Sequence, residues 1–128
     1  MMLYLEYVSG GGRNIMHEYP ITQSIVQIAN EEALKHGAKR ITEIRLKIGE
    51  LSGLVPESLQ IYFDMISQGT LSEGAKLVVV KVQIKFRCNN CGNESGVVGG
   101  IYKCPTCDSK DIKIINGNEY MIESMEVE

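Results

Sequence analysis

Two stretches of the chain carry apolar residues at the spacing of an amphipathic helix. Pro20 and Pro56 each fit a first helical turn, and Gly37 and Gly69 stand where the two patterns stop. Proline is tolerated at the start of a helix, and glycine is common just after its end. The apolar positions are Ile21, Ile25, Ile28, Ala29 and Leu34 in the first stretch and Leu59, Tyr62, Phe63 and Ile66 in the second. Their spacing near 3.6 residues predicts two helices.

Three other stretches alternate between apolar and polar residues, which is the period of a half-buried strand. The first covers residues 42–48, and the last covers residues 120–127 with one slip near Ser124 and Met125. The longest covers residues 77–86. In it, Val78, Val80, Val82, Ile84 and Phe86 alternate with Val79, Lys81, Gln83 and Lys85. These patterns predict three strands.

All four cysteines of the chain form two pairs, Cys88-x2-Cys91 and Cys104-x2-Cys107, with twelve residues between the pairs. Four thiolates at about 2.3 Å complete a closed tetrahedral shell, as structural zinc requires. Two disulfides are disfavoured because the chain looks intracellular. A single redox iron uses the same paired turns, and spacing does not separate iron from zinc. The pattern therefore predicts a metal-binding ribbon, with zinc as the favoured ion.

The predicted elements favour an α+β fold with the ribbon as an insertion. The strand at 120–127 cannot cover its own apolar face, so it needs partners in the main sheet. The two halves of the ribbon bring residues 86 and 118 together, which lets the chain leave that sheet and return to it. We expect two helices packed on a three-stranded sheet, formed by residues 16–85 and 118–128, with residues 86–117 as an inserted zinc-ribbon domain.

Charge and hydropathy argue against several classes of partner. The net charge is −3 and the pI is about 5.4, which disfavours nucleic acid and anionic membranes. Residues 86–113 carry four basic and three acidic side chains with only two aromatic rings, so no basic stripe with stacking rings is present. The longest apolar stretch is far short of the ~20 residues that span a bilayer. We expect a protein with no nucleic acid or membrane partner.

Residues 1–15 lack the basic start of a secretory signal and carry Glu6 inside their short apolar run. Three successive glycines follow Ser9. We therefore expect residues 1–15 to be a flexible N-terminal extension, and the protein to be cytoplasmic.

The chain has two histidines with different surroundings. His36 lies just before Gly37, where an imidazole can contact the last carbonyls of the helix. His17 stands in Met16-His17-Glu18, ahead of the first helix, and reads either as a surface histidine or as a ligand for nickel or copper. No cysteine is free, no serine lies in a nucleophile elbow and no glycine-rich phosphate loop follows a strand. An enzyme is not expected.

Several motifs in order along the chain resemble the hydrogenase nickel-incorporation protein (HypA) family. Met16-His17-Glu18 resembles that family's nickel motif, and residues 48–53 (IGELSG) followed by 56–59 (PESL) resemble its central signature. The two cysteine pairs, residues 117–119 (GNE) and residues 124–128 (SMEVE) also look like family positions. The resemblance runs from residue 16 to the end of the chain.

This resemblance implies a nickel metallochaperone that delivers Ni2+ during maturation of nickel-iron hydrogenase. It implies nickel held at Met16, His17 and Glu18, and structural Zn2+ held by Cys88, Cys91, Cys104 and Cys107. It also implies docking to the hydrogenase maturation GTPase (HypB) and to the hydrogenase large subunit. We expect the chain itself to be a monomer or weak dimer. In the family the nickel motif normally opens the chain, whereas here fifteen residues precede it.

A second interpretation is a zinc-ribbon adaptor or nucleic-acid-binding module without a nickel function. Salt-dependent binding to DNA would favour it.

Overall fold

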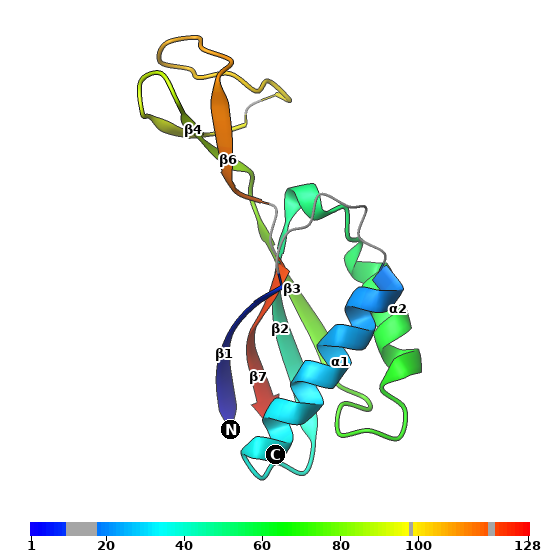
Figure 1. The fold of residues 1–128 in the computed structure, drawn as a ribbon. Coiled ribbons are helices and arrows are strands. Elements are labelled where there is room, and N and C mark those ends of the chain that lie inside the picture. Colours follow the sequence, from blue (N-terminus) through cyan, green and yellow to red (C-terminus); the bar gives the residue numbers. More distant parts are fainter. Residues whose placement is uncertain (10–17, 98, 118–119) are drawn as a thin grey trace.

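The main body of the molecule is a four-stranded sheet with two helices on one face. The computed structural model describes residues 1–9, 18–97, 99–117 and 120–128. The strands lie in the order β1 (Met2–Ser9), β7 (Tyr120–Val127), β2 (Ile41–Gly49) and β3 (Lys76–Val82). Helices α1 (Glu18–Lys35) and α2 (Pro56–Ile66) run side by side over this sheet (Figure 1). The α+β class predicted from the sequence is confirmed.

Strand β7, the last strand of the chain, lies between β1 and β2 in the sheet. It is antiparallel to β1 on one side and to β2 on the other, and β3 is parallel to β2. Arg45 of β2 faces Ser124, but its neighbour Leu46 faces Ile122, so Glu123 is skipped in the register. This bulge is the slip predicted near Ser124. It keeps both Ile122 and Met125 buried, although their spacing does not fit one uninterrupted strand face.

The helices bury one stripe each against the sheet. Leu59 and Phe63 of α2 are fully buried, and Pro56 begins that helix as predicted. In α1 the prediction for Leu34 is wrong. Its side chain is 64% exposed, and the smaller Ala33 occupies the buried position instead. The core joins both helices to the inner face of the sheet, at Leu3, Ile21, Ile25, Val26, Ala29, Ala33, Ile41, Ile44, Leu46, Ile48, Leu54, Leu59, Phe63, Ala75, Leu77, Ile122, Met125 and Val127.

The predicted strand 77–86 is two strands in two sheets. β3 ends at Val82, opposite Gly49, the last residue of β2, so β2 offers it no further partner residue. The apolar face also differs from the prediction. Leu77 and Val79 of β3 pair with Ile44 and Leu46 of β2, and this pairing turns Leu77 and Val79 toward the core. Val80, on the other face, is 41% exposed. Pairing with β2 decides which face of the strand is buried.

The first nine residues do not fit the expected flexible extension. Met2–Ser9 forms β1 along the edge of β7, so the sheet has four strands rather than three. Leu3 is 8% exposed and belongs to the core, opposite Met125. The N-terminal ammonium of Met1 donates to the Val127 carbonyl at 2.7 Å, and the Val127 N–H donates to the Met1 carbonyl at 2.8 Å. Edge pairing and one buried leucine make this segment part of the fold.

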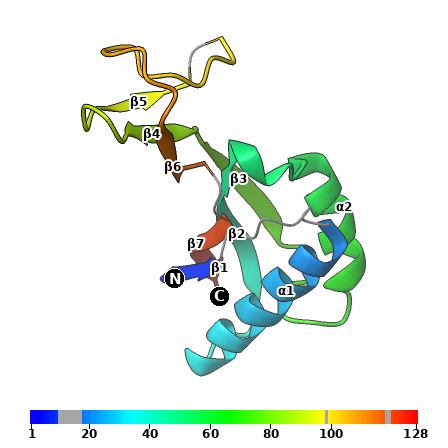
Figure 2. The ribbon, with the colours of Figure 1, turned by 45° about the horizontal axis from the view of Figure 1, so that its top comes forward.

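A small second lobe projects from one end of the main body. Its sheet has the order β5-β4-β6, formed by β4 (Lys85–Cys88), β5 (Glu94–Gly96) and β6 (Ile112–Asn116). Figure 2 shows the lobe standing clear of both helices. A 3-10 turn, η1 (Glu50–Ser52), follows β2 at the end of the body from which the lobe projects (Figure 1).

Candidate metal centre

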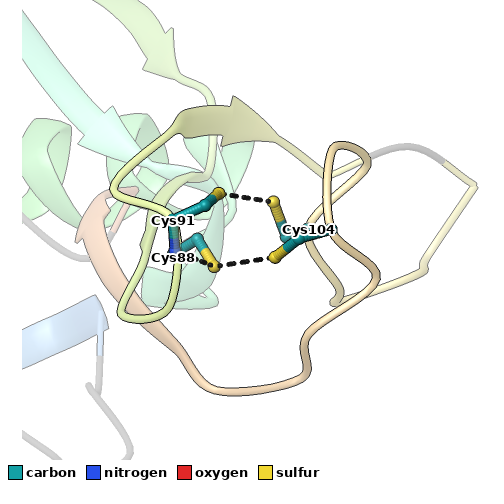
Figure 3. A group of neighbouring side chains, drawn as sticks. Cys88, Cys91 and Cys104 are labelled. Atoms are coloured by element: carbon teal, nitrogen blue, oxygen red, sulfur yellow. Dashed lines mark hydrogen bonds between the residues drawn. The ribbon is translucent and has the colours of Figure 1, made fainter.

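The four cysteines come together at the tip of the small lobe. Cys88 ends β4, Cys91 follows in a turn, and Cys104 and Cys107 lie in a second turn. The sulfurs of Cys88 and Cys107 are 3.5 Å apart, as are those of Cys91 and Cys104. All four sulfurs lie within 4.8 Å of one another. Figure 3 shows the sulfurs of the two turns facing each other.

The two turns have the same local construction. Gly92 N–H donates to the Cys88 carbonyl, and Asp108 N–H donates to the Cys104 carbonyl, both at 2.9 Å. Each donor follows the second cysteine of its pair and has a positive φ, +80° for Gly92 and 61° for Asp108. This left-handed residue closes the turn and directs both sulfurs of a pair to the same side.

The lobe around the cysteines has little apolar core. Phe86 is fully buried, and the buried cysteines are Cys88 and Cys104. At the surface, Glu94 of β5 pairs with Arg87 at 3.0 Å and with Lys85 at 3.2 Å. Arg87 and then Lys85 lower the pKa of Glu94 through these contacts. Exposed ion pairs of this kind contribute little to stability, so the lobe depends on what the cysteines bind.

The sulfur positions fit a tetrahedral metal ion. Zinc with four sulfurs at about 2.3 Å requires sulfur-to-sulfur distances of about 3.8 Å. The Cys88–Cys107 and Cys91–Cys104 sulfur distances are 3.5 Å, far longer than the ~2.05 Å of a disulfide, and none of the four cysteines is in a disulfide. The site is therefore compatible with structural zinc. Among the described residues, this is the group of histidine, cysteine and acidic side chains that is close enough to hold a metal ion.

The surroundings also prepare individual thiols as ligands. The backbone N–H of Cys107 lowers the pKa of Cys104, and the side-chain amide of Asn90 lowers the pKa of Cys107. For Cys91 the N–H of Asn93 favours the thiolate, but the neighbouring Cys104 sulfur, partial desolvation and the other two sulfurs together raise its pKa to about 12. Four sulfurs this close cannot all lose their protons without a cation between them.

Of the predicted nickel motif, Glu18 is the residue that the structure describes. Met16 and His17 are outside the described residues, and Glu18 is the first residue of the helix, with a half-buried side chain. Tyr19 packs edge-on against Tyr62 of α2, with ring centroids 5.6 Å apart, and so fixes this end of α1 against its neighbour. His36 lies at the other end of α1, where its Nδ1 is 2.9 Å from the Glu32 carbonyl, the helix-end contact predicted for it.

A tight crossing connects the lobe to the body. The chain enters the lobe past Ile84 and leaves it past Gly117, whose φ is +106°. A Cβ on Gly117 would stand 2.8 Å from the Ile84 Cα. The Gly117 carbonyl accepts a hydrogen bond from the N–H of Leu51 in η1 at 2.7 Å. Nothing in the local sequence predicted these contacts, because Ile84 and Leu51 are far from Gly117 along the chain.

Residues 16–127 match a family model whose description is "Hydrogenase/urease nickel incorporation, metallochaperone, hypA". The chain belongs to the HypA family. Among curated relatives, the hydrogenase maturation factor HypA of Caldanaerobacter subterraneus is 41% identical over 114 residues, covering 88% of this chain and 100% of the relative. That of Crocosphaera subtropica is 42% identical over 113 residues, covering 88% and 96%.

Solved HypA structures share the fold. A solution structure of the nickel metallochaperone HypA from Helicobacter pylori aligns with a TM-score of 0.66 at 26% identity, covering 88% of this chain and 97% of that one. A second HypA solution structure aligns with a TM-score of 0.70 at 27% identity, covering 89% and 98%. The resemblance drawn from the sequence motifs is confirmed, and β1 lies upstream of the matched region. No helix among the described residues is long and apolar enough to cross a membrane.

Proposed function

We propose that this chain binds Ni(II) through Met16, His17 and Glu18 and delivers it during maturation of nickel-iron hydrogenase. The observation that carries the proposal is the family match, which begins at Met16 and so includes all three residues. Imidazole nitrogen and carboxylate oxygen are suitable ligands for a divalent ion of this kind.

The position of Glu18 favours exchange over permanent binding. The first turn of a helix presents unpaired N–H groups and the positive end of the helix dipole, which repel a cation. The carboxylate of Glu18, in the first turn of α1, offsets that repulsion. Because fifteen residues precede Met16, its nitrogen is a peptide amide, a poorer ligand than a free amine. The carboxylate favours nickel binding, whereas the helix dipole and the peptide amide disfavour it. Such a site would hold nickel long enough to carry it and would still release it.

Zinc in the cysteine site would supply structure only. Cys88, Cys91, Cys104 and Cys107 would fill all four positions of a tetrahedral ion and leave none open for a substrate. In this division, residues 86–117 form the zinc domain, and residues 16–85 with 118–128 form the nickel domain. The protein would then be a carrier and not an enzyme.

The partners would be the hydrogenase maturation GTPase (HypB), which supplies nickel, and the hydrogenase large subunit, which receives it. The family's role in hydrogenase maturation supports this placement. A cytoplasmic monomer or weak dimer is sufficient for such transfer, because each step needs only a brief contact between two proteins.

Nickel titration of the His17→Ala variant tests the site. His36→Ala is the matched control, because His36 is exposed at the opposite end of α1. The proposal predicts that His17→Ala loses nickel binding while its zinc content and circular dichroism stay unchanged, and that His36→Ala binds nickel like the wild type. Unchanged nickel affinity in His17→Ala would show that the ligands lie elsewhere.

A further inference from the structure

Asn90 contacts sulfurs from both cysteine turns. Its backbone N–H lies 3.4 Å from the Cys88 sulfur in its own turn. Its side-chain Nδ2 donates to the Cys107 sulfur at 3.5 Å, across a sequence separation of 17 residues. One residue therefore connects the two halves of the metal site directly through their ligand atoms.

The side-chain amides of the neighbouring asparagines join the same two segments without donating to a sulfur. Asn89 Nδ2 donates to the Asp111 carboxylate at 3.0 Å. Asn93 Nδ2 donates to the Thr106 hydroxyl at 2.6 Å. Thr106 occupies the position in the second turn that Asn90 occupies in the first. The contact between an amide side chain and a ligand atom thus belongs to Asn90 and not to asparagines of this lobe in general.

The cysteine that receives this bond is an exposed residue. Cys88 and Cys104 are buried residues, whereas Cys91 and Cys107 are exposed ones. A metal-bound thiolate at the surface is where a proton, an oxidant or an alkylating reagent attacks, and the attack opens the metal shell. An N–H donor draws negative charge from the thiolate and fixes its direction, which weakens it as a nucleophile.

We propose that Asn90 is a positioning residue of the cysteine metal site, holding the Cys107 sulfur toward the metal and protecting it from attack. The inference rests on the proposed zinc occupancy of this site. Asn90 acts through Cys107 and is not itself a ligand. Cys91, the other exposed cysteine, has the backbone N–H of Asn93 as its donor and lacks this protection from an amide side chain.

The test compares zinc-loaded full-length chains of the wild type, Asn90→Ala, Asn90→Asp and the control Asn89→Ala. Asn90→Asp keeps the shape of the side chain but replaces its donor with a negative charge. Zinc release to a colorimetric chelator is followed after addition of N-ethylmaleimide, and the order of cysteine modification is mapped by mass spectrometry. Changes around metal ligands commonly alter affinity by 10-fold or more, so we expect release to accelerate roughly 10-fold in Asn90→Ala. We expect a larger acceleration in Asn90→Asp.

Two further readouts separate protection of Cys107 from general loosening of the lobe. In Asn90→Ala, modification of Cys107 should accelerate more than that of Cys91. The sulfur-to-metal charge-transfer band of the Co(II)-substituted chain should move to lower energy, because the thiolate loses a donor. Asn89→Ala should leave both readouts unchanged.

Three results would overturn the proposal. If Asn90→Ala releases zinc as slowly as Asn89→Ala, the role proposed for Asn90 is wrong, although the zinc assignment stands. The role is also wrong if all four cysteines react faster to the same extent and the cobalt charge-transfer band does not move, because Asn90 would then only stabilise the lobe. A wild-type chain that retains no zinc would overturn the zinc assignment as well, and this is measured before the variants are compared.

Discussion

Gly117 lies against Ile84 at the crossing between the two lobes, with no space for a side chain. A Cβ on Gly117 would stand 2.8 Å from the Ile84 Cα and 3.2 Å from its backbone nitrogen. These are backbone atoms of a segment that continues from β3 into β4, so they cannot move aside as a flexible side chain would. The contact fixes how the chain enters and leaves the metal lobe.

Gly117→Ala should therefore destabilise the protein by more than the strain of its positive φ. An alanine at positive φ costs about 1 to 2 kcal/mol, and the backbone collision adds to it. Gly69→Ala is the control, since Gly69 has a φ of +77° but nothing within 4 Å of the added carbon. Chemical denaturation measures both variants. Equal losses of unfolding free energy would mean that the crossing can relax.

Leu3→Asp should release β1 from the sheet. Leu3 is buried in the core, whereas the neighbouring Tyr4 is 78% exposed and makes Tyr4→Asp a matched control. Loss of one buried leucine costs about 2 kcal/mol, and detachment of the strand limits the damage to roughly that value. Hydrogen exchange at the Val127 amide reports the event, because this N–H donates to the Met1 carbonyl. Full protection of that amide in Leu3→Asp would contradict the role given to β1.

Removal of the metal should unfold the small lobe and leave the main body folded. Among the described residues 84–116, the buried hydrophobic side chains are Phe86 and two cysteines, which is too little to hold a lobe of this size. The main core lies outside this lobe. After the metal is removed with a chelator, the amides of β4 and β6 should lose protection from hydrogen exchange, whereas the amides of β2 should still exchange slowly. Simultaneous loss in both lobes would show that they fold as one unit.

Zinc affinity should rise with pH near neutrality. The pKa of the Cys91 thiol is raised to about 12 in the metal-free site, so this thiol is protonated at pH 7 and must lose its proton when metal binds. For each proton released on binding, the zinc affinity rises about tenfold per pH unit, as long as the pH is below that pKa. Calorimetry in buffers with different ionisation enthalpies counts the protons. Affinity independent of pH between 6 and 8 would contradict a protonated ligand.

Local patterns predicted most of this structure, and contacts between distant segments explain what they missed. Pro56 marked the start of α2, and the spacing of Cys88 and Cys91 predicted their shared turn. The buried face of β3 was predicted wrongly, because four residues in a row, Leu77 to Val80, are apolar and only pairing with β2 chooses between its faces. β1 and the bond from Asn90 to Cys107 were missed for the same reason. Each joins segments whose relative placement no short motif records.

In the function proposed for this chain, one metal is fixed by four sulfurs while another is carried and released. Full-length protein holding one zinc is given one equivalent of Ni(II), then challenged with a chelator and desalted, and both metals are measured by mass spectrometry. We expect nickel to be taken up and then lost to the chelator, while zinc stays bound. Displacement of zinc by nickel, or failure to take up nickel at all, would contradict it.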